Sequence, residues 1–441
     1  MKLESFFDLA RENGIEQSQI YVSKSSSFRI RLFHHEIETY NVSSTQGITA
    51  AGIVNGKFVT ASTPKIDKDT FQYLIDQLKL SAKFTEKPAE VDLFPGSSKY
   101  KKGSTYNPKL GKIPAKEKLD LLMKLEQAIY DADPRVTDTD MVTYSESEYE
   151  TIFMNSYGLK LRGKGNHFAI VSGVVVKQGE ETKTFYDGFV DNDLSKFDAK
   201  KFVNRLVERA VSKFGGSPCK AGLYPTVLHR EIASTFLSVL IRAASAESVQ
   251  RHSSFLEGRL NQKIASKKLT VVDKPLYRDL NYTYFDDEAV TTRNQTIIKD
   301  GVLLTYLHNR STAKKAGVEP TGNGRLAGRR MDVGFYNLFV KPGKQNFNEM
   351  ISSITDGVYI TEIAGLGTGL NDHSGDFSCQ AEGYRIRDGK LAEPLNLITL
   401  SGNVLKMFED LRCFDNDADD DNSGIICGNA FIKKMNIGGD N

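Results

Sequence analysis

A histidine and a glutamate lie close together in the segment VLHREIASTFLSVLI, where a predicted strand runs into a predicted helix at His229 and Glu231. A zinc helix of protease type sets two histidines four residues apart, with a glutamate after the first as general base. Here Arg230 follows the histidine and Ala233 stands at the fourth position. A spacing of five brings Ser234, and a serine hydroxyl is a poor zinc ligand. The residues alone therefore predict an ordinary helix start, with Glu231 placed favourably on the helix dipole.

A second group of reactive residue types lies in the glycine-rich segment GLGTGLNDHSGDFSCQAEGY. His373, Asp376 and Cys379 are residue types that bind metals or polar peptides. A glycine-rich loop that enters a strand explains the same pattern without any chemistry. Both interpretations stay open, and one alternative combines His229 with His373 and Cys379 in a non-standard metal site.

The run DNDADDDNSGII begins like a calcium-binding loop, because Asp415, Asp417 and Asp419 alternate along it. Such a loop needs a glycine at its sixth position and a bidentate glutamate at its twelfth. Asp420 and Ile426 stand there instead. The pattern predicts a solvated acidic loop.

A further loop, TGNGRLAGRR, combines glycines with arginines. Its spacing matches neither the dinucleotide-binding pattern nor the phosphate-binding P-loop. We expect a mobile loop that faces the substrate. It contains Gly322, Gly324, Arg325, Gly328, Arg329 and Arg330.

Composition excludes several classes of protein. The net charge is 58 − 56 = +2 and no run of five or six basic residues occurs, so we expect no nucleic-acid-binding footprint. The N-terminal stretch MKLESFFDLARENGI lacks the apolar core of a signal peptide, and no run of 18 apolar residues could span a membrane. We expect a cytoplasmic protein. Its four cysteines form no CxxC pair and are expected to be free, structural thiols.

The N-terminal half alternates helices with groups of strands. Hydrophobic spacing predicts the helices, period-two alternation predicts antiparallel strands, and Asn55-Gly56 predicts a two-residue hairpin turn. The helices are expected at 3–13, around 71–78, at 116–133 and at 195–214, and the strands within 19–62 and 136–178.

A domain boundary is predicted at the sequence Gly215-Gly216-Ser217-Pro218, because two glycines and a proline end a helix and redirect the chain. The predicted domains are residues 1–216 and 217–441. In the second, Asp-Gly turns within IIKDGVLLTYL and YRIRDGKLAEPLNLITL join apolar strands, and 345–355 and 402–411 have helical spacing. The fold class is α+β, with N-terminal helices and antiparallel meanders and a C-terminal, largely antiparallel sheet with flanking helices.

Five segments of the C-terminal half resemble the TldD/PmbA family, long labelled modulators of DNA gyrase. They are YPTVLHREIAS, SVQRHSSFLEGRL, IIKDGVLLTYL, SGDFSCQAEGYRIRDGKLAEPLNLITLSGN and IICGNAFIKKMNIGG. The N-terminal half is similar through its helix-and-meander layout, and the chain is closer to the PmbA (TldE) branch than to TldD. The resemblance implies a cytoplasmic, dimeric system for peptide hydrolysis. In it TldD holds zinc with an HExxxH helix and a C-terminal cysteine, and TldE is a metal-free partner subunit.

Transferred to this sequence, the HExxxH motif falls on His229, Arg230 and Ser234, so that only the first ligand type is present. Cys427 lies in a tail that resembles the metal-free branch. After SGDFS the family has small residues and glycine, whereas Cys379 and Gln380 stand here.

The resemblance therefore implies a PmbA/TldE-like subunit of a zinc metallopeptidase, with the zinc held by a TldD-like partner and no cofactor in this chain. It would form one wall of a cavity for an unfolded peptide. The residues expected to line that wall are Glu231, His373, Asp376 and Cys379. A self-sufficient metallopeptidase, a regulator of gyrase or of a toxin–antitoxin system, and a homodimer of the isolated chain are the open alternatives.

Overall fold

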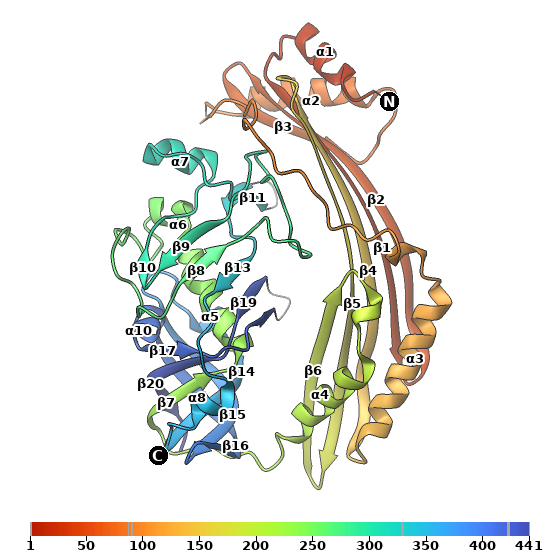
Figure 1. Cartoon of the computed structure of the whole chain (residues 1–441). Coiled ribbons are helices and arrows are strands. Elements are labelled where there is room, and N and C mark those ends of the chain that lie inside the picture. Colours follow the sequence, from red (N-terminus) through yellow and green to blue (C-terminus); the bar gives the residue numbers. More distant parts are fainter. Residues whose placement is uncertain (1, 87, 90, 328–329, 421–423, 441) are drawn as a thin grey trace. The chain divides into compact units, whose positions relative to one another are not determined.

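The computed structural model describes residues 2–86, 88–89, 91–327, 330–420 and 424–440. The chain divides into two compact units (Figure 1). Unit 1 comprises Met1–Lys177, Thr184–Val207 and Arg278–Thr291, and unit 2 comprises Gln178–Lys183, Glu208–Tyr277 and Thr292–Asn441. In the described part of the chain, no helix is long and apolar enough to cross a lipid bilayer.

Unit 1 is built on a six-stranded sheet with the order β3-β2-β1-β4-β5-β6. Its strands are long, and the longest has 20 residues. The predicted turn at Asn55 and Gly56 joins β2 to β3, and both residues adopt the positive φ that such a turn requires. The strands are β1 (Ser18–Phe33), β2 (Glu36–Val54), β3 (Lys57–Thr63), β4 (Val136–Asn155), β5 (Lys160–Gln178) and β6 (Glu181–Asp191).

Helices cover one face of this sheet at two places (Figure 1). α1 (Ser5–Glu12) and α2 (Thr70–Phe84) form a core with Ile20 and Val22 of β1. α3 (Ala115–Ala132) places the ammonium of Lys118 4.9 Å from the ring of Phe28, which alternates with those residues on the same face. These three predicted helices are confirmed.

The fourth predicted helix, 195–214, is shorter than expected. A 3-10 turn spans Leu194–Lys196 and α4 spans Ala199–Val211. The side chain of Asp193 accepts the N–H of Ser195 at 3.1 Å and so ends the preceding extended chain. The apolar spacing continues through both pieces, which is why they look like one helix in the sequence.

Unit 2 contains two six-stranded sheets. The first has the order β10-β9-β8-β13-β19-β18 and consists of β8 (Val271–Asp273), β9 (Gln295–Lys299), β10 (Val302–Leu303), β13 (Leu338–Val340), β18 (Asp419–Asp420) and β19 (Ile425–Cys427). The second has the order β16-β15-β14-β7-β20-β17 and consists of β7 (Gly222–Leu228), β14 (Asp356–Ala364), β15 (Asp376–Arg387), β16 (Lys390–Asn403), β17 (Leu411–Phe414) and β20 (Ala430–Gly438).

The second sheet closes on itself. β16 also pairs with β20, so that β16, β15, β14, β7 and β20 form a ring. β7 runs parallel to β14, and β13 runs parallel to β19, whereas the other pairings in the two sheets are antiparallel. The α+β class and the largely antiparallel pairing are confirmed. The strands form two six-stranded sheets, each with one parallel pairing, and one of the sheets is closed.

Helix α5 (Arg230–Ala243) lies between the two sheets rather than flanking one of them. Its buried side chains, such as Phe236 and Leu240, share one core with Val271 of the first sheet and Ile398 of the second. A helix buried on most of its circumference is typical of the interior of a large domain. The remaining helices are α6 (Ala246–Gln250), α7 (Arg310–Ala316), α8 (Phe347–Ile351), α9 (Leu366–Gly369) and α10 (Val404–Glu409).

The segment TGNGRLAGRR is not the plain loop that the sequence predicts. β11 (Gly324–Ala327) and β12 (Arg330–Val333) pair as an antiparallel hairpin. Alternation of glycine, arginine and apolar residues is compatible with a strand as well as with a loop, so the sequence alone does not distinguish the two structures. Gly328 and Arg329 lie outside the described residues.

Candidate functional site

The candidate site lies where β7 ends and α5 begins. His229 is the N-cap of α5, and its Nδ1 accepts the backbone N–H of Glu231 at 3.4 Å. The backbone N–H of His229 donates to the backbone carbonyl of Ile360 on the neighbouring β14 at 2.8 Å. A capping side chain satisfies one of the free N–H groups at a helix start. The predicted helix start, with Glu231 in the first turn, is therefore confirmed.

The side chains at this position do not fit a zinc ion. The imidazole of His229 is engaged as a helix cap. Arg230 brings a fixed positive charge to the place where a protease helix carries its glutamate, and a cation repels a metal ion. Ser234, at the place of the second histidine, is 2% exposed and donates its hydroxyl to the carbonyl of Glu231 at 2.9 Å.

Asn429 connects the start of α5 to two other elements. Its Oδ1 accepts the backbone N–H of Arg230 at 3.1 Å and the hydroxyl of Tyr359 at 3.3 Å. Its Nδ2 donates to a carboxylate oxygen of Asp415 at 2.6 Å. Burial raises the pKa of Tyr359, so its phenol stays protonated and able to donate. Asn429 lies 199 residues from Arg230, and no local pattern in the sequence points to it.

The acidic run is only partly the solvated loop that the sequence predicts. Asp415 is fully buried, and its carboxylate accepts N–H groups of Asn429 and Asp417 besides the Asn429 amide. Burial raises the pKa of Asp415, and these hydrogen bonds oppose the rise. Asp417 and Asp419 are exposed and lie 3.6 and 3.7 Å from the guanidinium of Arg230. The loop is thus attached to the first residue of α5.

A second arginine reaches the same place from α4. The guanidinium of Arg209 lies 3.4 Å from both carboxylate oxygens of Glu231 and donates to the carbonyl of Thr361. Glu231 also lies 3.6 Å from Nδ1 of His229. Arg209 and Glu231 lie on two different helices, 22 residues apart, so no spacing within one helix predicts this contact.

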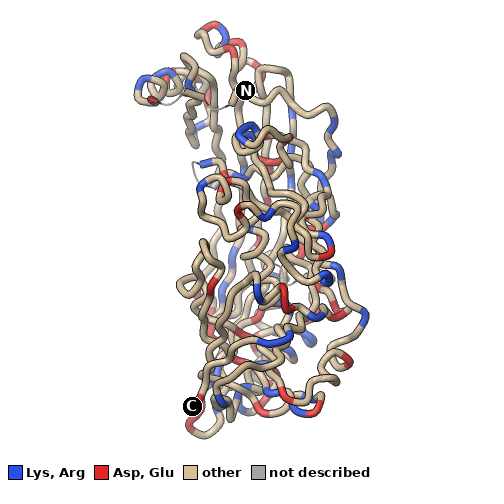
Figure 2. Tube along the Cα trace, turned by 90° about the vertical axis from the view of Figure 1, so that its left-hand side faces the viewer, with Lys and Arg blue, Asp and Glu red and all other residues tan. Residues whose placement is uncertain are grey.

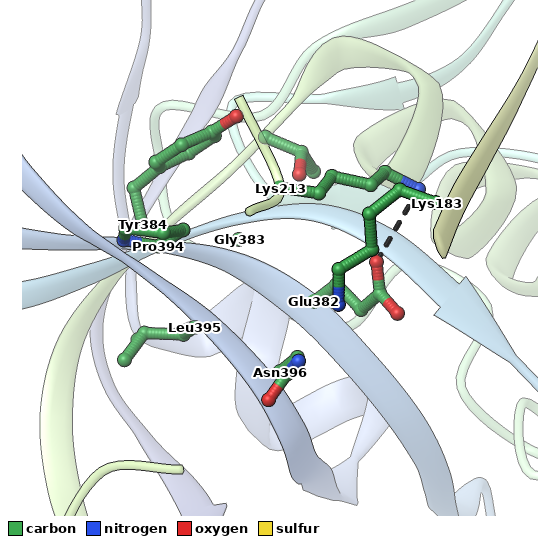
Figure 3. Close-up of a pocket in the computed structure, with 9 residues that line it drawn as sticks. Lys183, Lys213, Glu382, Gly383, Tyr384, Pro394, Leu395 and Asn396 are labelled. Carbon is green, nitrogen blue, oxygen red and sulfur yellow. Dashed lines mark ion pairs between the residues drawn. The ribbon is translucent and has the colours of Figure 1, made fainter. Parts of the chain in front are cut away.

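Lys213 holds the end of α4 in a small pocket of unit 2 (Figure 3). Its ammonium lies 2.7 Å from Glu362 and 3.3 Å from Glu382, and the second ion pair is drawn as a dashed line. Tyr384 on the pocket wall donates to Ser212. The free volume inside is about 10 Å³, roughly the room of one water molecule. The pocket therefore anchors the segment that carries Arg209 and has no room for a peptide.

Cys427 lies beside the helix start, since its thiol contacts the carbonyl of Arg230 at 3.6 Å. It is 1% exposed. Among the residues that the structure describes, no three or more His, Cys, Asp or Glu side chains are grouped so that they could hold a metal ion. All four cysteines are free, as the sequence predicts.

The glycine-rich segment forms a turn that enters β15, as its composition predicts. His373 is exposed, and its backbone N–H donates to the side-chain oxygen of Asn371. Asp376 is exposed and accepts from Ser374 and Asn403, and the Asn403 hydrogen bond lowers its pKa most strongly. These residues stabilise the turn and leave His373 accessible.

Cys379 does not present its thiol to a peptide, which corrects one of the expected cavity residues. It is 4% exposed, and its thiol contacts the carbonyl of Leu400 on β16 at 3.6 Å. Burial raises its pKa to about 11, so the reactive thiolate is disfavoured at neutral pH. In β15 alternate residues face the core, and Cys379 has the same parity as the buried Phe377 and Ala381.

Comparison with known families gives matches along most of the chain. The PmbA/TldA metallopeptidase C-terminal domain matches residues 221–439, and the central domain of the same family matches 108–214. Domain 1 of that family matches residues 19–82.

Individual relatives carry protease names. A metalloprotease of Methanothermobacter thermautotrophicus is 32% identical over 328 residues, which are 72% of this chain and 70% of the relative. The metalloprotease PmbA of Escherichia coli is 27% identical over 73% of this chain and 70% of its own length. A zinc metalloprotease TldD homolog of Saccharolobus solfataricus is 27% identical over 68% of this chain and 69% of its own length.

Two solved structures share the fold over nearly the whole chain. A Thermotoga maritima protein, named as a candidate modulator of a DNA gyrase, has a TM-score of 0.91 and 26% identity, and the match covers 98% of both chains. TldE of Thermococcus kodakarensis has a TM-score of 0.89 and 22% identity, with 99% of this chain and 100% of that chain covered. At this identity the second match supports the fold alone.

Proposed function

The chain belongs to the PmbA/TldD metallopeptidase family, and we propose that within it the chain is the PmbA/TldE-like subunit of a cytoplasmic TldD/TldE-type zinc metallopeptidase. The proposed complex degrades unfolded peptides and is a heterodimer with a TldD-like chain. The zinc, held by that partner, would supply a water molecule of lowered pKa for hydrolysis. This chain supplies surface that binds and orients the peptide.

One observation carries the proposal. Arg230 and Ser234 stand where a zinc helix needs its glutamate and its second histidine, and both are built into other contacts. The backbone of Arg230 is held by Asn429 and its guanidinium lies near Asp417 and Asp419. A guanidinium has only N–H donors and no acceptor atom, so this position offers no ligand to a metal ion.

Glu231, His373 and Asp376 are the proposed peptide-facing residues, since each has an exposed or partly exposed side chain. An extended, unfolded peptide is recognised mainly through its backbone, by hydrogen-bonding groups that tolerate many sequences. Carboxylates and an imidazole can accept or donate such hydrogen bonds without selecting one side chain.

The test is reconstitution. The purified chain, a TldD-like chain and the co-purified pair are analysed for zinc by mass spectrometry and assayed on a labelled, unstructured peptide. We expect zinc and full hydrolysis from the pair, and neither from this chain alone. Stoichiometric zinc together with peptidase activity from the isolated chain would overturn the proposal. His229→Ala in this chain serves as the matched variant, because it leaves the partner's zinc site intact.

The self-sufficient site on His229, His373 and Cys379 is not favoured by the arrangement. Cys379 faces the core, and His229 caps its helix. His373→Ala tests this alternative directly, because it should abolish metal binding if His373 is a ligand. Unchanged metal content in that variant eliminates the non-standard site.

A role as a regulator of gyrase or of a toxin–antitoxin system is the third candidate, and the description of the Thermotoga maritima protein names DNA gyrase. Lysines and arginines alternate with aspartates and glutamates along the trace (Figure 2). Direct binding to DNA needs a concentration of positive charge. Salt-dependent retention of the chain on DNA would therefore be required to revive this candidate.

A further inference from the structure

The outer edge of β2 is open over its first twelve residues. β1 pairs with β2 from Glu36 to Gly52 on one side. On the other side β3 pairs only with Ile48–Val54. In the described part of unit 1, no strand therefore covers the outer edge of residues 36–47. Such an edge presents unpaired N–H and C=O groups to another strand.

This edge lacks the usual protection against pairing. Exposed edge strands normally carry charges or prolines that prevent association. Residues 39–47, TYNVSSTQG, contain neither, although 26% of the chain is charged. The strand at the opposite side of the same sheet, β6, carries Glu181, Lys183, Asp187 and Asp191. In the open edge of β2 the charged residues Glu36 and Glu38 both lie at one end, whereas β6 carries charges along its length. The uncharged middle of the β2 edge is therefore available for pairing.

Apolar side chains follow the open edge on one face. Ile37 is 47% exposed, Tyr40 56% and Val42 68%. Their partners on β1 are Leu32, Ile30 and Phe28, which alternate and so share a face. The ring of Tyr40 packs edge-on against that of Phe28, with 5.5 Å between the centroids. The three side chains thus form a continuous apolar stripe along the free backbone.

We propose that the edge of residues 36–46 pairs with the same edge of a second copy of this chain, antiparallel and centred on Asn41. In this register the aromatic Tyr40 lies opposite the β-branched Val42 twice, once on each side of the two-fold axis. Such cross-strand pairs stabilise antiparallel sheets. Glu36 lies opposite Gln46 and Glu38 opposite Ser44, so no like charges meet.

The self-complementarity selects a second copy over an unrelated strand. A two-fold axis repeats every favourable contact, so one good pair contributes twice. A peptide of arbitrary sequence offers the same main-chain hydrogen bonds but not the matched apolar pair at both positions. The contact joins two six-stranded sheets edge to edge and removes the open edge from solvent. This inference is independent of the partner named in the proposed function, because it concerns unit 1 alone.

Cross-linking tests the register. Asn41→Cys places two thiols directly opposite each other at the axis, within the distance of a disulfide. We expect a covalent dimer under mild oxidation, seen on a non-reducing gel. Phe84→Cys, at a side chain that is 79% exposed on α2, is the control and should stay monomeric on the gel. No cross-link from Asn41→Cys, or equal cross-linking by both variants, overturns the proposal.

Charge exchange tests the pairing without cysteine. Sedimentation of the wild-type chain should show a dimer, and Tyr40→Lys or Val42→Glu alone should weaken dimerisation at least tenfold. The double variant places a lysine opposite a glutamate on both sides of the axis and should recover the dimer. A monomeric wild-type chain, or single variants that dimerise like the wild type, would show that the edge is not a site of self-association. Both substitutions lie at exposed positions, so folding is expected to be preserved.

Discussion

The side-chain amide of Asn429 donates to the buried carboxylate of Asp415 at 2.6 Å, while its oxygen accepts the N–H of Arg230. One amide thus links the acidic loop to the first turn of α5. A charged group that is fully buried requires such partners, because it has lost its hydration. The start of α5 is thus held by a network of hydrogen bonds that runs through Asn429.

Asn429→Ala should destabilise the protein by about 2–4 kcal/mol, because it leaves a buried carboxylate with fewer partners and an N–H without an acceptor. Urea unfolding followed by circular dichroism measures the change. Asn416→Ala is the control, since that exposed amide makes only a 3.4 Å contact to the carbonyl of Lys344. Equal unfolding midpoints for the two variants would contradict the role assigned to Asn429.

The buried carboxyl group of Asp273 should make the free energy of unfolding depend on pH. It is fully buried on β8, and burial raises its pKa to about 6, although the N–H groups of Tyr336 and Asn337 and the amide of Asn323 act in the opposite direction. Between about pH 4 and 6 the folded state therefore binds more protons than the unfolded state. The free energy of unfolding falls as pH rises through this window, by about 3 kcal/mol at most.

Asp273→Asn should remove this part of the pH dependence, so that the variant loses less stability than the wild type between pH 4 and 6. Chemical denaturation at several pH values gives the slopes. Asp133→Asn is the contrast. Arg135 lowers the pKa of Asp133 to about 2, and its contribution is lost only below about pH 4. Identical slopes for the wild type and Asp273→Asn would show that Asp273 does not titrate in this range.

Replacement of Gly383 by any larger residue should cause a severe steric clash. It lies at an irregularity of β15, and a Cβ added there would overlap the carbonyl oxygen of Tyr359 on β14. Gly383→Ala should destabilise the fold by more than about 3 kcal/mol, since two backbones would have to separate. Gly47→Ala is a matched control, because the nearest atom to its added Cβ is 3.7 Å away. Thermal unfolding of both variants distinguishes the sites, and similar melting temperatures would refute the steric argument.

Arg230→Ala tests whether the zinc is held by the partner subunit rather than by this chain. If the zinc belongs to the partner, the co-purified pair should keep its full zinc content, and peptide hydrolysis should fall by less than about fivefold, under 1 kcal/mol in transition-state terms. Loss of zinc from the pair would place Arg230 next to the metal and contradict the proposal. Lys315→Ala, on the exposed side of α7, is the neutral comparison.

Much of the fold was accessible from the sequence, because its signals are local. Alternation and the Asn55-Gly56, Asp300-Gly301 and Asp388-Gly389 turns located the hairpins, and these turn residues all adopt positive φ. Helix spacing located α1, α2 and α3. The arrangement of unit 2 was not accessible, because the parallel pairing of β7 with β14 joins segments more than 120 residues apart, as in Val358 with Thr226.

The candidate site was accessible only in part. His229, Arg230 and Ser234 were found because a zinc helix has a fixed spacing that can be checked residue by residue. Arg209, Tyr359 and Asn429 were missed, because each reaches the site through tertiary contacts with no local pattern. The burial of Asp415 has no local signal for the same reason, because its partner amide comes from Asn429 in the connection between β19 and β20. The division of the chain at residues 216 and 217 stays a prediction.

The ring of unit 2 also has a consequence for how the protein is made. β7 needs β20 as its neighbour, and their paired residues Leu228 and Ala430 are 430 − 228 = 202 positions apart. During synthesis on the ribosome, β7 therefore emerges long before the strand that completes its hydrogen bonds. The edge of β7 that pairs with β20 therefore stays without its partner strand while about 200 further residues are synthesised. The ring can close only after β20 has left the ribosome, and a variant that lacks β20 would leave the ring open.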